Sequence, residues 1–411
     1  MKKHIVILGA GPCGLGALWQ LKKLGVADVH AYEQCDHPGG MSSTFVDSKG
    51  FTWDIGGHVL GTKNKEFIDQ MHSLYTDPLE RYRRSAWVLV GSTMVPYPIQ
   101  YQAGSHLEHT ESVHGLSFYD WIIGSFGNEL AQSFFLPYNQ KLWKYPLQKM
   151  STSWIQEKIP QKDRCSAGSS WGGNAAFYYP SQGGMGSVWM EIAGKFKRKI
   201  MFNKQVTKID AKKHEITFLD GSTQGYDHML STMPLPVLLG MVKGIDIQAV
   251  VTLPYVGVAV VGIGMKGSPP EELRHCHWIY IPNSDVSFFR VSVYSNYGTG
   301  NAPTGSWSLL FETTIQPNEE IDTKAFIDKT IIQAHQCGLI GDLSCITSRF
   351  FHREAFAYPI PTIDRDDILI PVQSVLEEND IYSRGRFGGW KYEEGNMDDA
   401  WMQGVMWAAK I

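Results

Sequence analysis

The chain has 411 residues, too many for one hydrophobic core, so roughly two or three domains are expected. The formal net charge of -4 argues against a surface that binds nucleic acid or an anionic membrane, and hydrophobic and aromatic contents of 43% and 12% indicate a globular protein. No stretch offers about 18 uninterrupted apolar residues, and the six cysteines form no C-x-x-C pair. We therefore expect a cytoplasmic enzyme with reduced thiols and no membrane segment.

The chain begins with the pattern of a β-strand, a helix and a second β-strand. Ile5–Leu8 is a short apolar strand, residues 13–24 have the pattern of an amphipathic helix, and Val29–Tyr32 is a second apolar strand. This order predicts a βαβ unit of a parallel sheet.

The turn after the first strand carries Gly9, Gly11 and Gly14 in the spacing G-x-G-x-x-G. Gly9 permits a tight turn, Gly11 lets a pyrophosphate approach the backbone, and Gly14 lets the helix pack closely on the strand. The helix N-terminus supplies free N–H groups for phosphates. Glu33, at the end of the second strand, can accept hydrogen bonds from a ribose diol. Together these features predict a dinucleotide site.

A second glycine-rich region follows the βαβ unit. The dipeptide Gly39-Gly40 forms a turn, a strand pair is expected through residues 51–55, and the tripeptide Gly56-Gly57-His58 comes next. Two interpretations of this tripeptide remain open. Its backbone can lie against a flat ring beside one titratable donor, or it can be a hairpin turn with a surface histidine.

Helix and strand patterns alternate in the middle of the chain. Residues 65–80 look helical, residues 87–90 and 94–97 look like two strands around a turn, and residues 116–158 form an aromatic-rich helical segment. Residues 168–186 are rich in glycine and show no helical pattern, so this stretch is interpreted as a functional or mobile loop.

Histidines cluster twice without the spacing of metal ligands. His106, His109 and His114 lie in a polar loop, and His275 and His277 flank a cysteine beside a strand pattern. Neither group has the ligand spacing of a common metal site, so no metal is expected. The second group is interpreted as decoration of a sheet edge.

The second half of the chain is rich in strand patterns. Residues 204–209, 215–219 and 226–230 look like a three-stranded meander, and residues 250–297 and 306–314 look like an antiparallel sheet.

A second G-x-G-x-x-G at residues 262–267 is followed by Ser-Pro-Pro rather than by a helix, so it is not interpreted as a dinucleotide site. Residues 322–337 look helical. Residues 385–392 look like a glycine-rich strand that leads into a last helix at 398–409, whose N-terminus would form a second anion site. One βαβ fingerprint together with this second site predicts FAD rather than a separate NAD(P)H domain.

The predicted fold class is α/β, with a discontinuous Rossmann-like FAD-binding domain, an inserted helical subdomain and an antiparallel β-sheet substrate domain. The predicted boundaries are 1–80, 173–235 and 380–411 for the FAD-binding domain, 102–172 for the helical subdomain, and 81–101 with 236–379 for the sheet domain.

Several segments give the chain a family resemblance. They are GFTWDIGGHV (50–59), VPYPIQ (95–100), PYNQKLW (137–143), WGGNAAFYYPSQGGMGSVW (171–189), WIYIPNSDVSFFRVSVYSNY (278–297), AYPIPT (357–362) and GRFGGWKYEEGN (385–396). With the N-terminal fingerprint, they make the chain resemble the UDP-galactopyranose mutase family, in its eukaryotic-type branch, within the FAD-dependent amine-oxidase superfamily.

The resemblance implies roles for individual residues. The catalytic candidates, which include a histidine near the flavin and a group that grips the diphosphate, are His58, Lys158, Tyr280, Arg290, Tyr358, Arg386 and Tyr392. The cofactor-binding candidates are Gly9, Gly11, Gly14, Glu33, Gly39, Gly40, Gly57, His58, Arg84, Val206, Gly388, Asn396 and Met397. The candidates for uracil and sugar binding are Tyr97, Gln100, Phe134, Asn139, Trp143, Asn174 and Trp278.

Four positions depart from the family pattern. Lys158 replaces an arginine and lacks its bidentate fork, and Tyr178 also stands where the family has an arginine. Met397 replaces a polar residue and Gly61 an aromatic one. These changes are compatible with a different sugar.

The resemblance implies a non-redox mutase that interconverts UDP-galactopyranose, or a related UDP-sugar, and its furanose form. N5 of reduced FAD acts as the nucleophile on the anomeric carbon, and NADPH or NADH is a candidate reductant. An FAD-dependent amine oxidase or desaturase and a non-catalytic flavin-binding protein are the alternatives. No nucleic-acid or membrane partner is expected, and a homo-oligomer is left open.

Overall fold

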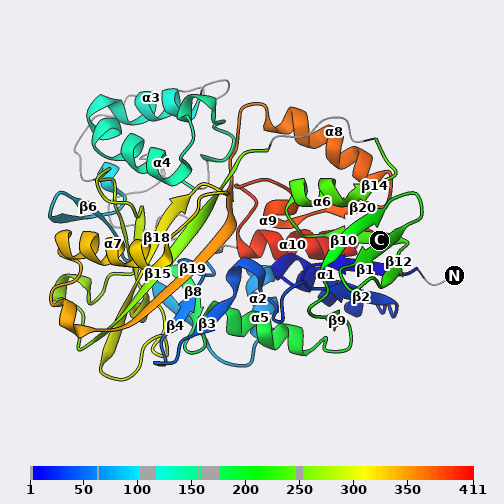
Figure 1. The fold of residues 1–411 in the computed structure, drawn as a ribbon, viewed down its shortest axis with the longest axis horizontal. Helices are drawn as coiled ribbons and strands as arrows, with labels where there is room; N and C mark the ends of the chain where they lie inside the picture. The colour runs from blue at the N-terminus through cyan, green and yellow to red at the C-terminus, as the bar shows by residue number, and fades with distance from the viewer. Residues whose placement is uncertain (1–2, 63, 102–116, 156–157, 160–175, 247–252) are drawn as a thin grey trace.

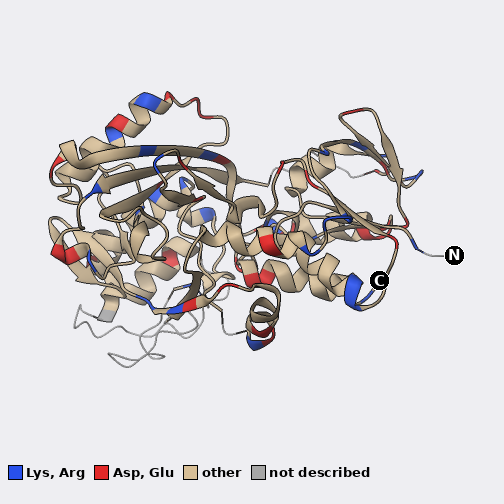
Figure 2. Ribbon diagram, turned by 90° about the horizontal axis from the view of Figure 1, so that it is seen from below, with Lys and Arg blue, Asp and Glu red and all other residues tan. Residues whose placement is uncertain are grey.

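The computed structural model describes residues 3–62, 64–101, 117–155, 158–159, 176–246 and 253–411. Figure 1 shows two β-sheet regions that lie side by side, with the first and last helices of the chain together in one region. Figure 2 shows basic and acidic residues interspersed in both regions.

A five-stranded parallel sheet joins segments from both ends of the sequence. Its order is β20-β13-β1-β2-β9, and its strands are β1 (Ile5–Leu8), β2 (Val29–Tyr32), β9 (Ile200–Met201), β13 (His228–Ser231) and β20 (Ile381–Ser383). The central strand β1 is buried along its whole length, as a continuous apolar run requires in a parallel sheet. This sheet and its helices confirm the predicted Rossmann-like α/β fold.

Helices α1 (Pro12–Lys23) and α10 (Met397–Ala408) pack closely against each other. A methyl group added at Gly16 would overlap the carbonyl oxygen of Trp401, and one added at Gly404 would overlap that of Cys13. Two glycines without side chains therefore let the first and last helices of the sequence approach closely.

A small sheet beside the parallel one corrects the predicted meander. Its order is β12-β11-β10-β14, and its strands are β10 (Val206–Asp210), β11 (Glu215–Phe218), β12 (Thr223–Gly225) and β14 (Val242–Lys243). The third meander strand is β12, whereas the segment expected at 226–230 forms β13 of the parallel sheet, where its apolar residues are buried beside β1.

The second region is a seven-stranded sheet of order β19-β15-β18-β17-β16-β6-β7. Its strands are β6 (Ala86–Val90), β7 (Thr93–Pro96), β15 (Tyr255–Lys266), β16 (Trp278–Tyr280), β17 (Arg290–Val293), β18 (Ser306–Ile315) and β19 (Ile346–Pro359). Neighbours are antiparallel, as predicted, except that β16 pairs with β6 in parallel. The long strand β19 has no counterpart among the predicted elements.

Helices surround the two regions. They are α2 (Lys65–Leu74), α3 (Phe118–Leu130), the π-helical turn η3 (Ala131–Phe135), α4 (Leu136–Trp143), α5 (Gly184–Gly194), α6 (Leu235–Met241), α7 (Thr323–Gln336), α8 (Arg365–Glu377) and α9 (Gly385–Gly388). Short 3-10 turns lie at Gly40–Ser42, Ile99–Tyr101, Leu147–Lys149, Glu271–Leu273, Tyr294–Asn296 and Leu343–Cys345.

Two two-stranded sheets complete the fold: the first agrees with the strand pair expected through residues 51–55, and the second corrects two predictions. They pair β3 (Thr44–Val46) with β4 (Thr52–Asp54) and β5 (Leu79–Arg83) with β8 (Ala176–Pro180). The predicted helix at 65–80 therefore ends earlier, and the glycine-rich stretch 168–186 contains a strand and the start of α5, while its first residues lie outside the described part of the chain.

The second G-x-G-x-x-G forms the end of β15, with Gly267 directly after the strand, and no helix follows it, in agreement with the sequence. There Gly262 and Gly264 make room for the rings of Trp53 and Phe51. Among the helices of the described residues, none has the length and apolar character needed to cross a membrane.

Candidate functional site

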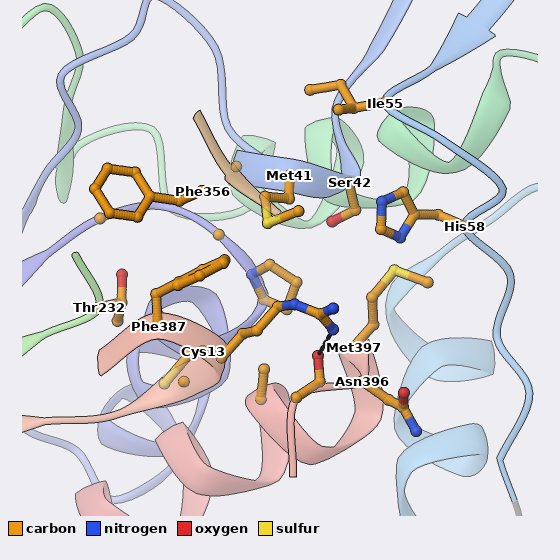
Figure 3. Close-up of a pocket in the computed structure, with 18 of the residues that line it drawn as sticks. Cys13, Met41, Ser42, Ile55, His58, Thr232, Phe356, Phe387, Asn396 and Met397 are labelled. Carbon is orange, nitrogen blue, oxygen red and sulfur yellow. Dashed lines mark hydrogen bonds between the residues drawn. The ribbon is translucent and has the colours of Figure 1, made fainter. Parts of the chain in front are cut away.

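A cavity of about 1170 Å³ lies where the parallel sheet meets the seven-stranded sheet. Its walls come from the turn after β1, the end of β2, the loop after β4, one face of β19 and the segment from α9 to the start of α10. Figure 3 shows one wall formed by Met41, Ser42, Ile55 and His58 and the opposite wall by Cys13, Phe387, Asn396 and Met397.

The glycine turn after β1 borders this cavity. Gly9 has a φ of +106°, and a side chain at Gly14 would overlap the carbonyl oxygen of Gly9, so both positions require glycine. The nearest atom to a methyl group at Gly11 would be 3.8 Å away, which leaves the space beside this residue open on the cavity side. No described side chain caps the N-terminus of α1 at Gly11. The turn thus fits the pyrophosphate of a dinucleotide.

Glu33, at the end of β2, lies on the cavity wall. The side chain is 7% exposed, Oε2 accepts the backbone N–H of Ala10 at 2.8 Å, and Oε1 accepts that of Cys35 at 2.9 Å. The carboxylate therefore stays oriented on the cavity wall, where Val206 also lies. A carboxylate in this position suits a ribose diol.

His58 faces the cavity, which bears on the two interpretations of its loop. Burial and the nearby charge of Arg386 lower the pKa of His58 to about 4, so the ring is neutral near pH 7. Gly40, Gly57, Asn396 and Met397 line the same part of the cavity. His58 is half-buried on the cavity wall rather than a surface histidine of a hairpin turn, and its place beside a flat ring stays a prediction.

Three of the predicted cofactor-binding glycines do not line the cavity. Gly14, Gly39 and Gly388 are not among the described residues that line the cavity. The carbonyl oxygen of Gly388 accepts a hydrogen bond from Gln373 Nε2 at 3.0 Å, and the predicted glycine-rich strand at this point is the short helix α9 instead.

A cationic and phenolic group forms the side of the cavity near β17, β19 and the loop before α10. It consists of Lys158, Arg290, Tyr358, Arg386 and Tyr392, all predicted from the family resemblance. The guanidinium carbon of Arg386 lies 5.3 Å from the ring centre of Tyr358 and 5.5 Å from that of Tyr392, and Lys158 Nζ lies 5.3 Å from the Tyr392 ring. We call these five residues the anion cluster.

Lys158 also contacts the start of the last helix. Its ammonium donates to Oδ1 of Asn396, the N-cap residue of α10, at 2.7 Å. Both residues line the cavity, so one cation reaches from the anion cluster to the helix beside the candidate flavin site.

Glu312 is a site residue that the sequence did not reveal. Its carboxylate, 2% exposed, accepts Nε of Arg290 at 2.6 Å and Nη2 at 2.7 Å. Oε1 also accepts the backbone N–H of Gly57 at 3.3 Å. A glutamate inside an apolar strand pattern gave no signal, because its role depends on a partner on the neighbouring strand.

Arg84 lines the cavity between two aromatic rings. Its guanidinium carbon lies 4.7 Å from the ring centre of Trp278 and 5.5 Å from that of Tyr97, and Nη2 donates to the Tyr280 hydroxyl at 3.3 Å. The Tyr97 and Tyr280 rings are 4.7 Å apart. Arg84 is thus embedded in an aromatic cage.

The described residues predicted to bind uracil or sugar mostly lie away from the cavity wall. Tyr97, Gln100, Phe134, Asn139 and Trp143 are not on the cavity wall formed by the described residues, and neither is Tyr280, which was predicted to grip the diphosphate. Trp278, the other described member of the predicted substrate group, lines the cavity. Asn139 donates to the Phe135 carbonyl at 2.8 Å, and Trp143 packs on Tyr392 with ring centres 5.0 Å apart. Asn174 lies outside the described residues.

Tyr138 joins this aromatic group and was not predicted. Its ring lies 5.4 Å from that of Tyr280 and 5.5 Å from that of Phe134, and burial raises its pKa. Its position one residue before Asn139 is the signal that could have found it.

The structure tests the prediction for one of the two histidine groups. His277 is buried, and its Nδ1 accepts the backbone N–H of Ser85 at 3.0 Å, so its interpretation as edge decoration is wrong. His106, His109 and His114 lie outside the described residues. In the part of the chain that the structure describes, no three His, Cys, Asp or Glu side chains are grouped to hold a metal ion.

The departures from the family pattern are spread over the site. Lys158, Met397 and Gly61 line the cavity. Tyr178 lies in β8 and forms a backbone bridge with Leu60, outside the described cavity wall.

Comparisons with known proteins agree with this geometry. A family model described as flavin containing amine oxidoreductase matches residues 113–411, and one for an NAD(P)-binding Rossmann-like domain matches residues 7–73. A crystal structure of reduced UDP-galactopyranose mutase matches with a TM-score of 0.92 and 34% identity, covering 99% of this chain and 93% of that chain.

More distant structures share the fold alone. Putrescine oxidase bound to putrescine matches with a TM-score of 0.69 and 15% identity, covering 100% of this chain and 99% of that chain. A fatty acid isomerase from P. acnes matches with a TM-score of 0.70 and 13% identity, covering 100% and 98%. The chain therefore belongs to the flavin-containing amine oxidoreductase family and, within it, to the UDP-galactopyranose mutase family.

Proposed function

We propose that the protein is a flavin-dependent nucleotide-sugar mutase that interconverts UDP-galactopyranose, or a related UDP-sugar, and its furanose form without net redox change. The observation that carries this proposal is the anion cluster, which places three cations and two phenols on one side of the cavity. An amine or an apolar substrate has no anionic group for such a cluster to bind.

The cluster suits a diphosphate that must leave and return. A diphosphate carries about two negative charges at neutral pH, which guanidinium and ammonium groups bind through charge-assisted hydrogen bonds. Arg290 is held by Glu312 before any ligand arrives, so its orientation need not be acquired on binding. Tyr358 and Tyr392 add neutral donors on the same side.

The flavin end of the cavity is assigned to FAD in its reduced form. When bound, reduced FAD supplies the nucleophile for the anomeric carbon of the sugar. Gly9, Gly11 and Glu33 hold the dinucleotide portion, and His58, neutral near pH 7, lies where the ring portion would be held. NADPH or NADH is the proposed source of electrons.

The nucleobase is assigned to the aromatic residues behind Arg84. Tyr97 and Phe134 offer ring faces, and Gln100 and Asn139 offer amide groups. Since Tyr97 and Tyr280 contact each other, uracil would enter by replacing a contact between rings. The role of Asn174, the eukaryotic-type branch, the cytoplasmic location and the oligomeric state stay predictions.

The direct test is to incubate the purified holoenzyme with UDP-galactopyranose, with and without dithionite or NADPH, and to separate the sugar isomers by chromatography before mass spectrometry. The furanose form should accumulate only in the reduced samples. Steady oxygen consumption with an amine, and no sugar product, would establish the oxidase alternative instead. A panel of other nucleotide sugars then identifies the preferred substrate.

A further inference from the structure

Arg365, the first residue of α8, is a buried arginine whose ion pairs the proposed chemistry does not use. The residue is 2% exposed. Nη1 donates to Glu393 Oε2 at 2.9 Å, Nη2 to Glu393 Oε1 at 2.7 Å, and Nε to Asp366 Oδ1 at 2.9 Å. All three guanidinium nitrogens are thus engaged by carboxylates.

Glu393, the bidentate partner of Arg365, belongs to the loop 391–396, which carries two residues of the candidate site. Tyr392 of the anion cluster immediately precedes Glu393, and Asn396 at the end of the loop caps α10. The loop has a second anchor at its far end, because Arg386 Nη1 donates to the carbonyl oxygen of Gly395 at 2.9 Å. Two arginines therefore hold the loop at two points.

The Arg365 side of the pair lies where two other segments of the site meet. The N–H of Arg365 donates to the Thr362 carbonyl at 3.3 Å, four residues beyond Tyr358 of the anion cluster. Ser151 N–H donates to the Pro361 carbonyl at 2.8 Å, and this joins the segment that leads toward Lys158. Arg365 is thus connected to the chain segments that carry three members of the anion cluster.

Burying a guanidinium is an expensive way to stabilise a fold even when carboxylates pair with it, because apolar residues of similar volume are often at least as stable. The distinctive property of a bidentate pair is geometric, since two parallel N–H···O bonds fix the orientation of both partners. We propose that Arg365 is a positioning residue, which through Glu393 sets the place of Tyr392 and of the Asn396 cap. The link to catalysis rests on the proposed function.

The first test measures the loop directly. Arg365→Lys and Glu393→Gln each remove the bidentate pair while keeping a polar side chain of similar size. In both variants, amide hydrogen exchange of residues 391–396 in the ligand-free protein should be about tenfold faster than in the wild type. Ile331→Ala, in the separate core under α7, is the control for general destabilisation and should leave exchange in this loop unchanged. Wild-type exchange rates in both loop variants would overturn the proposal.

The second test measures the effect on binding. UDP titration followed by calorimetry should show about tenfold weaker binding for Glu393→Gln, and Ile331→Ala should bind UDP like the wild type. Combining Glu393→Gln with Tyr392→Phe should add little to the larger single effect, because both changes act through the Tyr392 hydroxyl. Strictly additive effects would contradict an action through Tyr392. If the wild type does not bind UDP, the proposed function is wrong, and the exchange experiment still decides whether Arg365 positions the loop.

Discussion

Arg290 and Glu312 are cross-strand partners on β17 and β18, and their side chains form two parallel hydrogen bonds of 2.6 and 2.7 Å. The same carboxylate accepts the N–H of Gly57, directly before His58. One buried carboxylate therefore joins the diphosphate side of the cavity to the loop beside the candidate flavin ring. A substitution of Arg290 or Glu312 is therefore expected to affect both the diphosphate side of the cavity and the loop that carries His58.

Arg290→Ala should impair both binding and stability. It removes a diphosphate ligand and leaves the Glu312 carboxylate buried without its charged partner. We expect UDP to bind about 100-fold more weakly, and the free energy of unfolding to fall by about 3 kcal/mol. Calorimetric titration with UDP and chemical denaturation measure the two effects.

The double variant Arg290→Ala with Glu312→Gln separates these effects. Replacing the carboxylate by a neutral amide should restore part of the lost stability without restoring UDP binding, because no cation returns. Recovery of UDP affinity in the double variant would mean that Arg290 serves only to neutralise Glu312. A non-catalytic flavin protein would show the stability change alone.

Only the second of the variants Gly11→Ala and Gly14→Ala should destabilise the ligand-free fold. A methyl group at Gly11 meets no protein atom closer than 3.8 Å, whereas one at Gly14 overlaps the Gly9 carbonyl. Gly11→Ala should therefore keep the apoprotein melting temperature but lower the flavin content, measured as flavin absorbance per chain. Gly14→Ala should lower the apoprotein melting temperature itself. Full flavin occupancy in Gly11→Ala would contradict a pyrophosphate at this turn.

Lys158 is expected to tolerate arginine but not an apolar residue. Lys158→Met removes both the charge and the hydrogen bond to Asn396, and UDP should bind about tenfold more weakly. Lys158→Arg should preserve or tighten binding, because a guanidinium restores the bidentate fork. If Lys158→Arg folds normally but loses activity, the ammonium does not face the diphosphate.

His277 should make the protein sensitive to acid. Burial, followed by the charge of Arg84, lowers the pKa of His277 to about 4 from an ordinary value of 6.5, and the neutral Nδ1 accepts the Ser85 N–H. As the pH falls below about 6.5, the unfolded chain takes up the proton first, so the stability contribution present above that pH is lost on the way to pH 4. The loss is on the order of 3 kcal/mol for a group this buried.

His277→Asn provides the comparison, since an amide oxygen can replace Nδ1 as an acceptor but does not titrate. The difference in unfolding free energy between the wild type and the variant should shrink or reverse between pH 7 and pH 4. Measuring this difference cancels other groups, including Asp54, whose pKa burial raises to about 6 and whose contribution has the opposite sign. A difference that does not change with pH would show that His277 is not held neutral.

The sequence predicted the parts of the fold that are encoded locally. The strand at 5–8, the following helix and the strand at 29–32 agree with the structure within one residue, because their apolar periods and glycines lie in one short stretch. The segment at 226–230 was assigned to the wrong sheet, since its partner β1 lies more than two hundred residues earlier. The long strand β19 mixes charged and aromatic residues without a regular alternation, and its position beside β15 is what identifies it as a strand.

The site shows the same division between local and distant signals. Gly9, Gly11, Glu33 and His58 lie in recognisable local patterns, and the structure brings them to one cavity. Glu312 could not be found, because a lone acid in a strand acquires its role only from Arg290 opposite. The domain boundaries and the roles of the individual site residues stay predictions.

The close contact of α1 with α10 has a consequence for biosynthesis. Gly16 and Gly404, which allow that contact, are separated by nearly the whole sequence, so a nascent chain exposes the glycine turn long before α10 leaves the ribosome. The cavity is complete only when both helices are present, since the turn before α1 and the start of α10 both contribute residues to its lining. Cofactor capture is therefore expected as a late step of maturation, after translation of this sequence, rather than as the nucleus of folding.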